Sequence, residues 1–145
     1  AVDRGGGLTW HGPGQVVGYP VVKWGDRKGE ASVADVIHII EGWLIETLAT
    51  FGVVGVRDER MQGVWVNGRK VCSIGLSFLR WVSRHGFSVN LNTPVGRVEG
   101  VAGCGLAADT TTSLCALGHD IHPEDFVQAL LPVVHRTLGP TSENR

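Results

Sequence analysis

The chain has 145 residues and a mass of 15.5 kDa, with 13 Lys and Arg against 14 Asp and Glu, so its formal net charge is -1. This balance argues against nucleic acid or an anionic membrane as the partner, because both attract strongly basic proteins. Hydrophobic residues make up 43% of the chain, yet no apolar run approaches the roughly 20 residues that span a bilayer. We therefore expect a single cytoplasmic domain over residues 1–145, with neither signal peptide nor transmembrane segment.

The first expected elements are a buried strand and a long helix. An almost continuous apolar run predicts a strand over residues 16–24, interrupted by Gly18 and Pro20. Apolar side chains then recur at helical spacing between Ser32, a natural N-cap, and Gly52, a natural helix end. They are Val33, Val36, Ile37, Ile40, Trp43, Leu44 and Leu48.

A hairpin is expected in the middle of the chain. Asn67-Gly68 is a strong two-residue turn signal, and it lies between apolar runs that predict strands over residues 63–66 and 69–79. Two further strands are expected over residues 53–56 and 85–91.

The C-terminal part is expected to hold an irregular loop and a second helix. Residues 96–118 are rich in Gly, Ala and Thr, which is typical of a functional loop. Pro123 suits the first turn of a helix, and Pro132 is expected to kink or interrupt it. Its expected apolar stripe is Phe126, Leu130, Leu131 and Val134. Together these elements predict an α/β or α+β domain with a mixed β-sheet flanked by helices.

The segment from Arg4 to Gln15 combines a cation, a run of glycines, an aromatic ring and an imidazole. Glycines let main-chain amides approach an acyl or phosphate oxygen, and Arg4 and His11 add hydrogen-bond donors. The alternative is a glycine-rich turn with a hydrogen-bonded histidine. A Walker A loop is excluded, because no Gly-Lys-Ser/Thr follows.

Lys70 is a candidate for proton transfer. It follows the expected turn, and alternation along a strand would place it on one face with Cys72, Ile74 and Leu76. Burial on such a face would lower the pKa of its ammonium towards a useful range. The alternative is a hairpin lysine whose ammonium reaches water.

Cys104 is a candidate nucleophile. Gly103 and Gly105 flank it and leave its sulfur accessible, but a thiol with a pKa of about 8.5 needs a nearby cation or base. The alternative is a small buried cysteine in a loop.

The cysteines and histidines do not indicate a disulfide or a metal centre. Three cysteines, without paired spacing, suggest a reducing compartment. Cys115, His119 and His122 are within zinc-ligand spacing, but there is no Cys-x-x-Cys pair, so we expect no metal. A serine hydrolase is also disfavoured, because the chain has no Gly-x-Ser-x-Gly elbow.

Five motifs carry a resemblance that runs over nearly the whole chain. They are Arg4-Gly-Gly-x-x-Thr-Trp-His-Gly-x-Gly-Gln with Tyr19, Gly63-Val-Trp-Val, Lys70-Val-Cys-Ser-Ile-Gly75, His85-Gly86 with Asn90, and Cys104-Gly105 with Thr112-Ser113-Leu114. In order and spacing they resemble the lipoyl(octanoyl) transferase family. The resemblance implies the biotin/lipoate protein ligase fold, a mixed sheet flanked by helices.

The resemblance implies an octanoyltransferase, which catalyses the first step of protein lipoylation. The family takes an octanoyl group from octanoyl-acyl carrier protein, holds it as a thioester on a cysteine, and passes it to a lysine of a lipoyl domain. By matching motifs, Cys104 would be the nucleophile and Lys70 its partner, either as an ammonium beside the thiolate or as an amine that takes protons. The implied acceptors are lipoyl domains of 2-oxoacid dehydrogenase E2 subunits and the glycine cleavage H protein.

The resemblance also implies an acyl-binding site. Its residues would be Arg4, Gly5, Gly6, Gly7, Leu8, Thr9, Trp10, His11, Ser73, Ile74, Gly75, Gly86, Phe87 and Ser88. An eight-carbon chain needs an apolar slot, and its carbonyl needs amide donors. Because the incoming thioester is already activated, no cofactor is expected. The related lipoate ligases use ATP, and Cys104 at the transferase position disfavours that activity.

Several positions depart from the family pattern. Gly103 stands where proline is usual before the cysteine, Pro94 where an acidic residue is common, and Val98 where an aromatic is common. The chain also begins three residues before the Arg4 motif, so the family's preceding strands and helix are expected to be missing. Gly103 and the missing N-terminal portion favour an alternative, a non-catalytic or impaired relative that binds acyl groups or lipoyl domains. Lys70 and Cys104 favour the active enzyme, which is the function that we expect.

Overall fold

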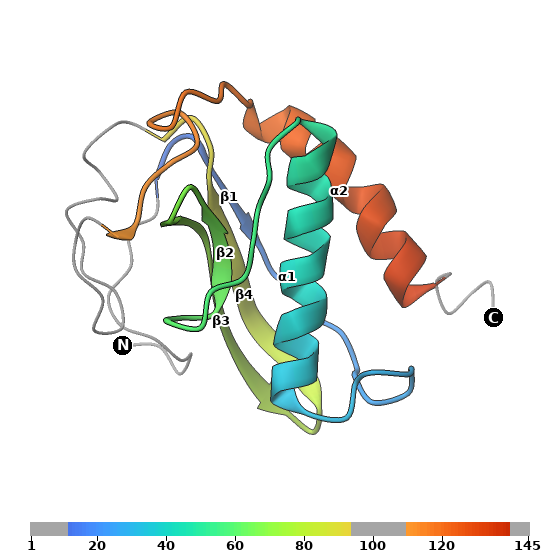
Figure 1. The fold of residues 1–145 in the computed structure, drawn as a ribbon. Coiled ribbons are helices and arrows are strands. Elements are labelled where there is room, and N and C mark those ends of the chain that lie inside the picture. The colour runs from blue at the N-terminus through green and yellow to red at the C-terminus, as the bar shows by residue number, and fades with distance from the viewer. Residues whose placement is uncertain (1–11, 94–109, 140–145) are drawn as a thin grey trace.

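The computed structural model describes residues 12–93 and 110–139, which form a four-stranded sheet and two helices. In chain order the elements are β1 (Gln15–Gly18), α1 (Val33–Thr50), β2 (Gly63–Val66), β3 (Arg69–Leu79), β4 (Val82–Asn90) and α2 (Pro123–Leu138). The strand order is β1-β4-β3-β2, and both helices lie against the same face of the sheet (Figure 1). The predicted class, a sheet with helices packed on it, is confirmed.

All three strand pairs are antiparallel. β1 pairs with β4, β4 with β3, and β3 with β2. The parallel pairing found in the described residues is a single bridge between Lys70 and Thr111. The mixed character expected of the sheet is therefore limited, in this part of the chain, to that bridge.

The helix α1 begins where the sequence predicts. Ser32 accepts a hydrogen bond from the Asp35 amide at 3.1 Å, and the Asp35 carboxylate accepts one from the Ser32 amide at 3.1 Å. This reciprocal pair satisfies two amide donors that the first helical turn leaves unpaired. The helix ends at Thr50, and Gly52 follows with a φ of +74°.

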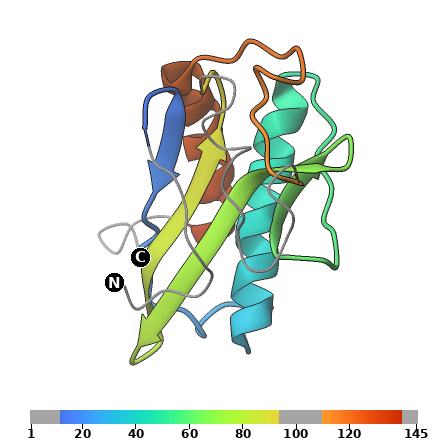
Figure 2. The same cartoon turned by 90° about the vertical axis from the view of Figure 1, so that its left-hand side faces the viewer.

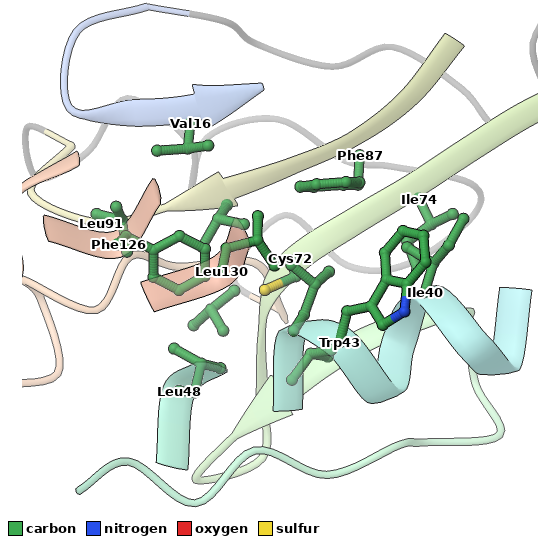
Figure 3. Packing of buried hydrophobic residues seen from close by; sticks show 14 of the residues in the cluster. Val16, Ile40, Trp43, Leu48, Cys72, Ile74, Phe87, Leu91, Phe126 and Leu130 are labelled. Carbon is green, nitrogen blue, oxygen red and sulfur yellow. The ribbon is translucent and has the colours of Figure 1, made fainter. Parts of the chain in front are cut away.

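One hydrophobic core fills the space between the helices and the sheet. Figure 3 shows side chains from β1, α1, β3, β4 and α2 meeting there, with the Cys72 sulfur among them. The labelled residues are Val16, Ile40, Trp43, Leu48, Cys72, Ile74, Phe87, Leu91, Phe126 and Leu130. Burying each large apolar side chain contributes about 1.5–3 kcal/mol, so this interface fixes the helices on the sheet.

One predicted strand is shorter than expected, and another does not form. The strand over residues 16–24 ends at Gly18, where the Phe87 ring occupies the space that a Cβ would need, 2.3 Å from Phe87 Cζ. Pairing resumes only at Lys23, which bridges to Val82. The strand expected over residues 53–56 is wrong, because only Val56 pairs, in an isolated bridge to Trp65.

The strand β4 begins three residues earlier than predicted, because the turn before it has no sequence signal. Arg80 and Trp81 form this turn with φ values of +51° and +64°, a conformation that usually requires glycine or asparagine. The Trp81 ring stacks on the Phe78 ring, with 4.8 Å between their centroids. The main-chain carbonyl of Trp81 accepts a hydrogen bond from the Trp24 amide at 3.0 Å. These contacts offset the strain of the turn.

The second helix runs through Pro132 without interruption, so of the two effects expected of this proline, the interruption is wrong. A proline removes the hydrogen bond to the carbonyl four residues earlier, here that of Gln128. Gln128 and Pro132 are both exposed, so water can satisfy that carbonyl. The buried stripe is Phe126, Leu130 and Val133, whereas Leu131 is exposed.

We predict that Pro132→Ala stabilises the protein by about 1–2 kcal/mol, because it restores a helical hydrogen bond at an exposed position. Pro123→Ala is the matched control, since a proline at the first helical position sacrifices no helical bond. Urea unfolding measures both variants. Equal stabilities of the two variants would contradict the description of α2.

Candidate functional site

A β-bulge decides which face of the sheet Lys70 occupies. Val64 pairs with Cys72 and Trp65 pairs with Lys70, so Val71 is an extra residue in the ladder. An extra residue shifts the alternation of side chains by one. Cys72 therefore points towards the helices, and Lys70 points away from them with Trp65. The predicted placement of Lys70 on the face of Cys72 is wrong, because the bulge breaks the period of two.

We call the sheet face turned away from α1 and α2 the helix-free face, since no helix of the described residues covers it (Figure 1). Its central positions follow from the strand register. Ser73 pairs with Ser88, and Gly75 pairs with Gly86, on the same side as Lys70. These four residues, all predicted to bind the acyl group, form a floor of small residues on the side of the lysine, and the Gly18 carbonyl and Pro20 cover this floor at Gly86.

Two other predicted acyl-binding residues belong to the opposite face. Ile74 and Phe87 pair with each other across β3 and β4, and both are part of the hydrophobic core. They are 4% and 7% exposed, respectively. They can contribute to an acyl site only by supporting its floor from beneath.

Lys70 is held in a defined place. Its exposed fraction is 3%, and its Cδ passes 3.4 Å from the position that a Cβ would take on Gly63. Its Nζ donates to the Met61 sulfur at 3.3 Å. The Met61 carbonyl in turn accepts a hydrogen bond from Trp65 Nε1 at 3.2 Å. The alternative of a lysine whose ammonium reaches water does not fit a residue this buried.

The strands β3 and β4 separate beyond the Cys72–Val89 pair, and a later segment fills the fork. Figure 2 shows that the orange segment before α2 begins beside the start of β3. There the Thr112 amide donates to the Lys70 carbonyl at 2.9 Å. Thr112, like the two residues that follow it, is fully buried. The main chain of Lys70 is thus fixed by a segment about 40 residues away in sequence.

Of the two cysteines in the described residues, Cys72 does not resemble an activated nucleophile. Cys72 is fully buried, and this burial raises the pKa of its thiol far above the usual range, an effect that the charge of Lys70 only partly offsets. Cys115 is exposed on the surface. Cys104 and residues 4–11 lie outside the described residues, so their roles stay predictions.

Two structural features bear on metals and membranes. Across residues 12–93 and 110–139, no three His, Cys, Asp or Glu side chains gather as a metal site would require, so Cys115, His119 and His122 do not form one. Neither α1 nor α2 has the length and apolarity of a bilayer-spanning helix.

Sequence analysis missed residues whose importance depends on contacts between distant segments. Met61 follows no recognisable motif, and its contact with Lys70 arises because the bulge turns the lysine towards it. Gly63 belonged to a noted motif without an assigned role. It has a φ of +138°, and a Cβ there would lie 2.3 Å from the Cys72 carbonyl oxygen, so no other residue fits beside the bulge.

We predict that Gly63→Ala lowers the free energy of unfolding by about 3 kcal/mol or more, because it adds a clash to backbone strain. Gly68→Ala is the matched control. Its φ is also positive, at +80°, but a Cβ there meets nothing within 4 Å, so we expect a loss of only about 1 kcal/mol. Urea unfolding compares them, and equal losses would argue against a tightly packed bulge.

Similarity to known proteins agrees with the fold and the motifs. The chain is similar to curated octanoyltransferases of Novosphingobium aromaticivorans, at 44% identity over 133 residues, and of Rubrobacter xylanophilus, at 41% over 139 residues. These matches cover 88% and 94% of this chain but 59% and 61% of the relatives. The chain therefore spans less than two thirds of their length.

Solved structures show the same fold at low identity. A lipoate-protein ligase A bound with ATP superposes with a TM-score of 0.71 at 12% identity, over 94% of this chain and 57% of the other. The biotin protein ligase of Aquifex aeolicus superposes with a TM-score of 0.66 at 14% identity, over 86% of this chain and 53% of the other. The model of the lipoyl protein ligase A/B catalytic domain matches residues 1–134. The chain belongs to the lipoyl protein ligase A/B catalytic domain family.

Proposed function

We propose that the protein is an octanoyltransferase of protein lipoylation. It would take an octanoyl group from octanoyl-acyl carrier protein, hold it on Cys104, and pass it to a lysine of a lipoyl domain. The observation that carries this proposal is a buried lysine, Lys70, turned by a bulge onto the helix-free face beside a floor of small residues. The similarity to curated octanoyltransferases supports the same activity.

The proposed chemistry is two acyl transfers through a thioester. In the first, the Cys104 thiolate attacks the carbonyl carbon of the donor thioester, and the sulfur of the acyl carrier protein leaves as a thiolate. In the second, the amine of the acceptor lysine attacks the Cys104 thioester, forms an amide, and releases the Cys104 sulfur. The acceptor amine loses one proton in this step. No nucleotide is required, because the donor is already a thioester.

Lys70 would assist both transfers. As an ammonium it would stabilise the Cys104 thiolate, and as an amine it would take the proton that the thiol or the acceptor amine gives up. Two features of the described residues support this role. Lys70 is fixed by the bulge and by Thr112, and Cys104 lies only seven residues before Thr111, which pairs with Lys70.

The acyl chain would lie on the helix-free face. Ser73, Gly75 and Ser88 present short or absent side chains to it, whereas the Gly18 carbonyl and Pro20 fill the space over Gly86. Residues Arg4 to His11 are proposed to complete the site with amide donors. Such a site suits an octanoyl group, whose hydrocarbon chain needs apolar space and whose carbonyl needs hydrogen-bond donors.

The proposed partners follow from the reaction. The donor is octanoyl-acyl carrier protein, and the acceptors are lipoyl domains of 2-oxoacid dehydrogenase E2 subunits and the glycine cleavage H protein. The proposed location is the cytoplasm. We propose a reaction that needs neither a cofactor nor a metal ion.

The test is intact-mass spectrometry after incubation with octanoyl-acyl carrier protein. We expect the wild type to gain the mass of one octanoyl group, which hydroxylamine or an added lipoyl domain removes. Cys104→Ser and Lys70→Ala should lose most of this adduct. The matched controls are Cys115→Ser, which removes an exposed cysteine, and Lys23→Ala, which removes an exposed lysine. Both should form the adduct normally.

The outcomes separate catalysis from binding. A folded wild type that never gains the octanoyl mass would refute the proposed activity. If it nevertheless binds octanoyl-acyl carrier protein, the non-catalytic alternative replaces the enzyme. An adduct that persists in Cys104→Ser but disappears in Cys115→Ser would show that the thioester forms on Cys115, which would refute the role of Cys104.

A further inference from the structure

Asn90 ends β4 with a buried amide on the helix-free face. Its exposed fraction is 3%, and it pairs in register with Gln15 of β1. Gln15 Nε2 donates to Asn90 Oδ1 at 2.6 Å, and Asn90 Nδ2 donates to the Thr112 carbonyl at 3.1 Å. The side chain thus links an edge strand to the segment that fills the fork.

The peptide groups of Thr112 are held from both sides of the fork. The Thr112 amide donates to the Lys70 carbonyl on β3, and the Thr112 carbonyl accepts from Asn90 on β4. The main chain of Asn90 adds a further link, because its carbonyl accepts from the Leu114 amide at 2.9 Å. Lys70 and Asn90 belong to strands that no longer pair here, so Thr112 connects them.

An asparagine at this position is not explained by strand formation alone. Asparagine is depleted in strands, and a buried amide lowers stability unless its donors and acceptor are used. Here the oxygen and one N–H are both used, and each bond leads to a different segment. An apolar residue would be compatible with the strand, but it would leave the Thr112 carbonyl without this donor.

We propose that Asn90 is a positioning residue for the transfer reaction. By holding Thr112 in the fork, it fixes the main chain of Lys70, and through it the direction of the lysine side chain. Asn90 does not touch the reacting atoms in this account. The inference rests on the proposed function, because Lys70 must matter for its position to matter.

The test compares two variants of Asn90 with one matched control. Asn90→Ala removes both side-chain bonds, whereas Asn90→Asp keeps an oxygen for Gln15 and loses the donor to Thr112. The control is Ser83→Ala, at the other end of β4. Ser83 is also fully buried. Its hydroxyl accepts from Trp24 Nε1 at 2.9 Å and from the Val22 amide at 3.4 Å, and it donates to the Pro20 carbonyl, so Ser83→Ala removes at least as many side-chain bonds, away from Lys70.

Steady-state kinetics with octanoyl-acyl carrier protein and a lipoyl domain provide the readout, and thermal unfolding reports stability. We expect both Asn90 variants to lose about 10- to 100-fold in kcat, because small misplacements of a catalytic group are costly. The KM for the donor should stay within about threefold, since binding is not removed. Ser83→Ala should lose comparable stability and keep its kcat within about twofold.

The failures of the two proposals are distinguishable. If the wild type turns over and the Asn90 variants keep the kcat of Ser83→Ala, the positioning role is refuted and the proposed function stands. A donor KM that rises while kcat is unchanged would also refute it, because Asn90 would then act in binding. If the wild type neither forms an adduct nor turns over, the proposed function fails, and this inference fails with it.

Discussion

Val71 has no pairing partner on β2, so β3 forms a bulge there. At the bulge, Val71 and Cys72 both point towards the core. This bulge moves Lys70 to the other side of the sheet, where Met61 accepts its hydrogen bond. Burying a lysine is costly unless partners are provided. In the described residues, Met61 is one such partner, and the main chain of Lys70 is bonded by Thr112, which enters where β3 and β4 separate.

The rigidity of this region comes from the opposite side of the sheet. Glu41 of α1 is buried, and its carboxylate accepts from the Gly63 amide at 2.9 Å and from Arg57 Nε at 3.0 Å. Removing the Glu41 carboxylate would leave the buried Gly63 amide without this acceptor, which costs about 1–3 kcal/mol. The helix therefore fixes the first residue of β2, and Gly63 in turn lies against the stem of Lys70. A well-packed core on one face thus determines the geometry on the other.

Local signals in the sequence predicted local structure well. The Ser32 N-cap of α1 and the Asn67-Gly68 turn depend on neighbouring residues, and both form as expected. The face of Lys70 could not be predicted, because the bulge depends on how β2 pairs with β3 rather than on any residue type. The Arg80-Trp81 turn was missed for a similar reason, since its strain is offset by the distant amide of Trp24.

The candidate site was also predictable only in part, because motifs identify residues but not the contacts between distant segments. The motifs named Ser73, Gly75, Gly86 and Ser88, which do share a face with Lys70. Motifs alone did not separate them from Ile74 and Phe87, because alternation places neighbours in a motif on opposite faces. The link from Asn90 to Lys70 passes through Thr112, which is distant in sequence from both, so only the folded chain shows it.

The central claim is that the bulge places Lys70 on the helix-free face, and nuclear Overhauser measurements test it most directly. Met61 is the single methionine of the chain, so a ¹³C-methyl methionine label gives one signal to assign. The account predicts cross-peaks from this methyl group to the Lys70 side chain, and from Lys70 to the Gly63 α-protons. Cross-peaks from the Lys70 side chain to the core side chain of Ile74, with none to Met61, would contradict it.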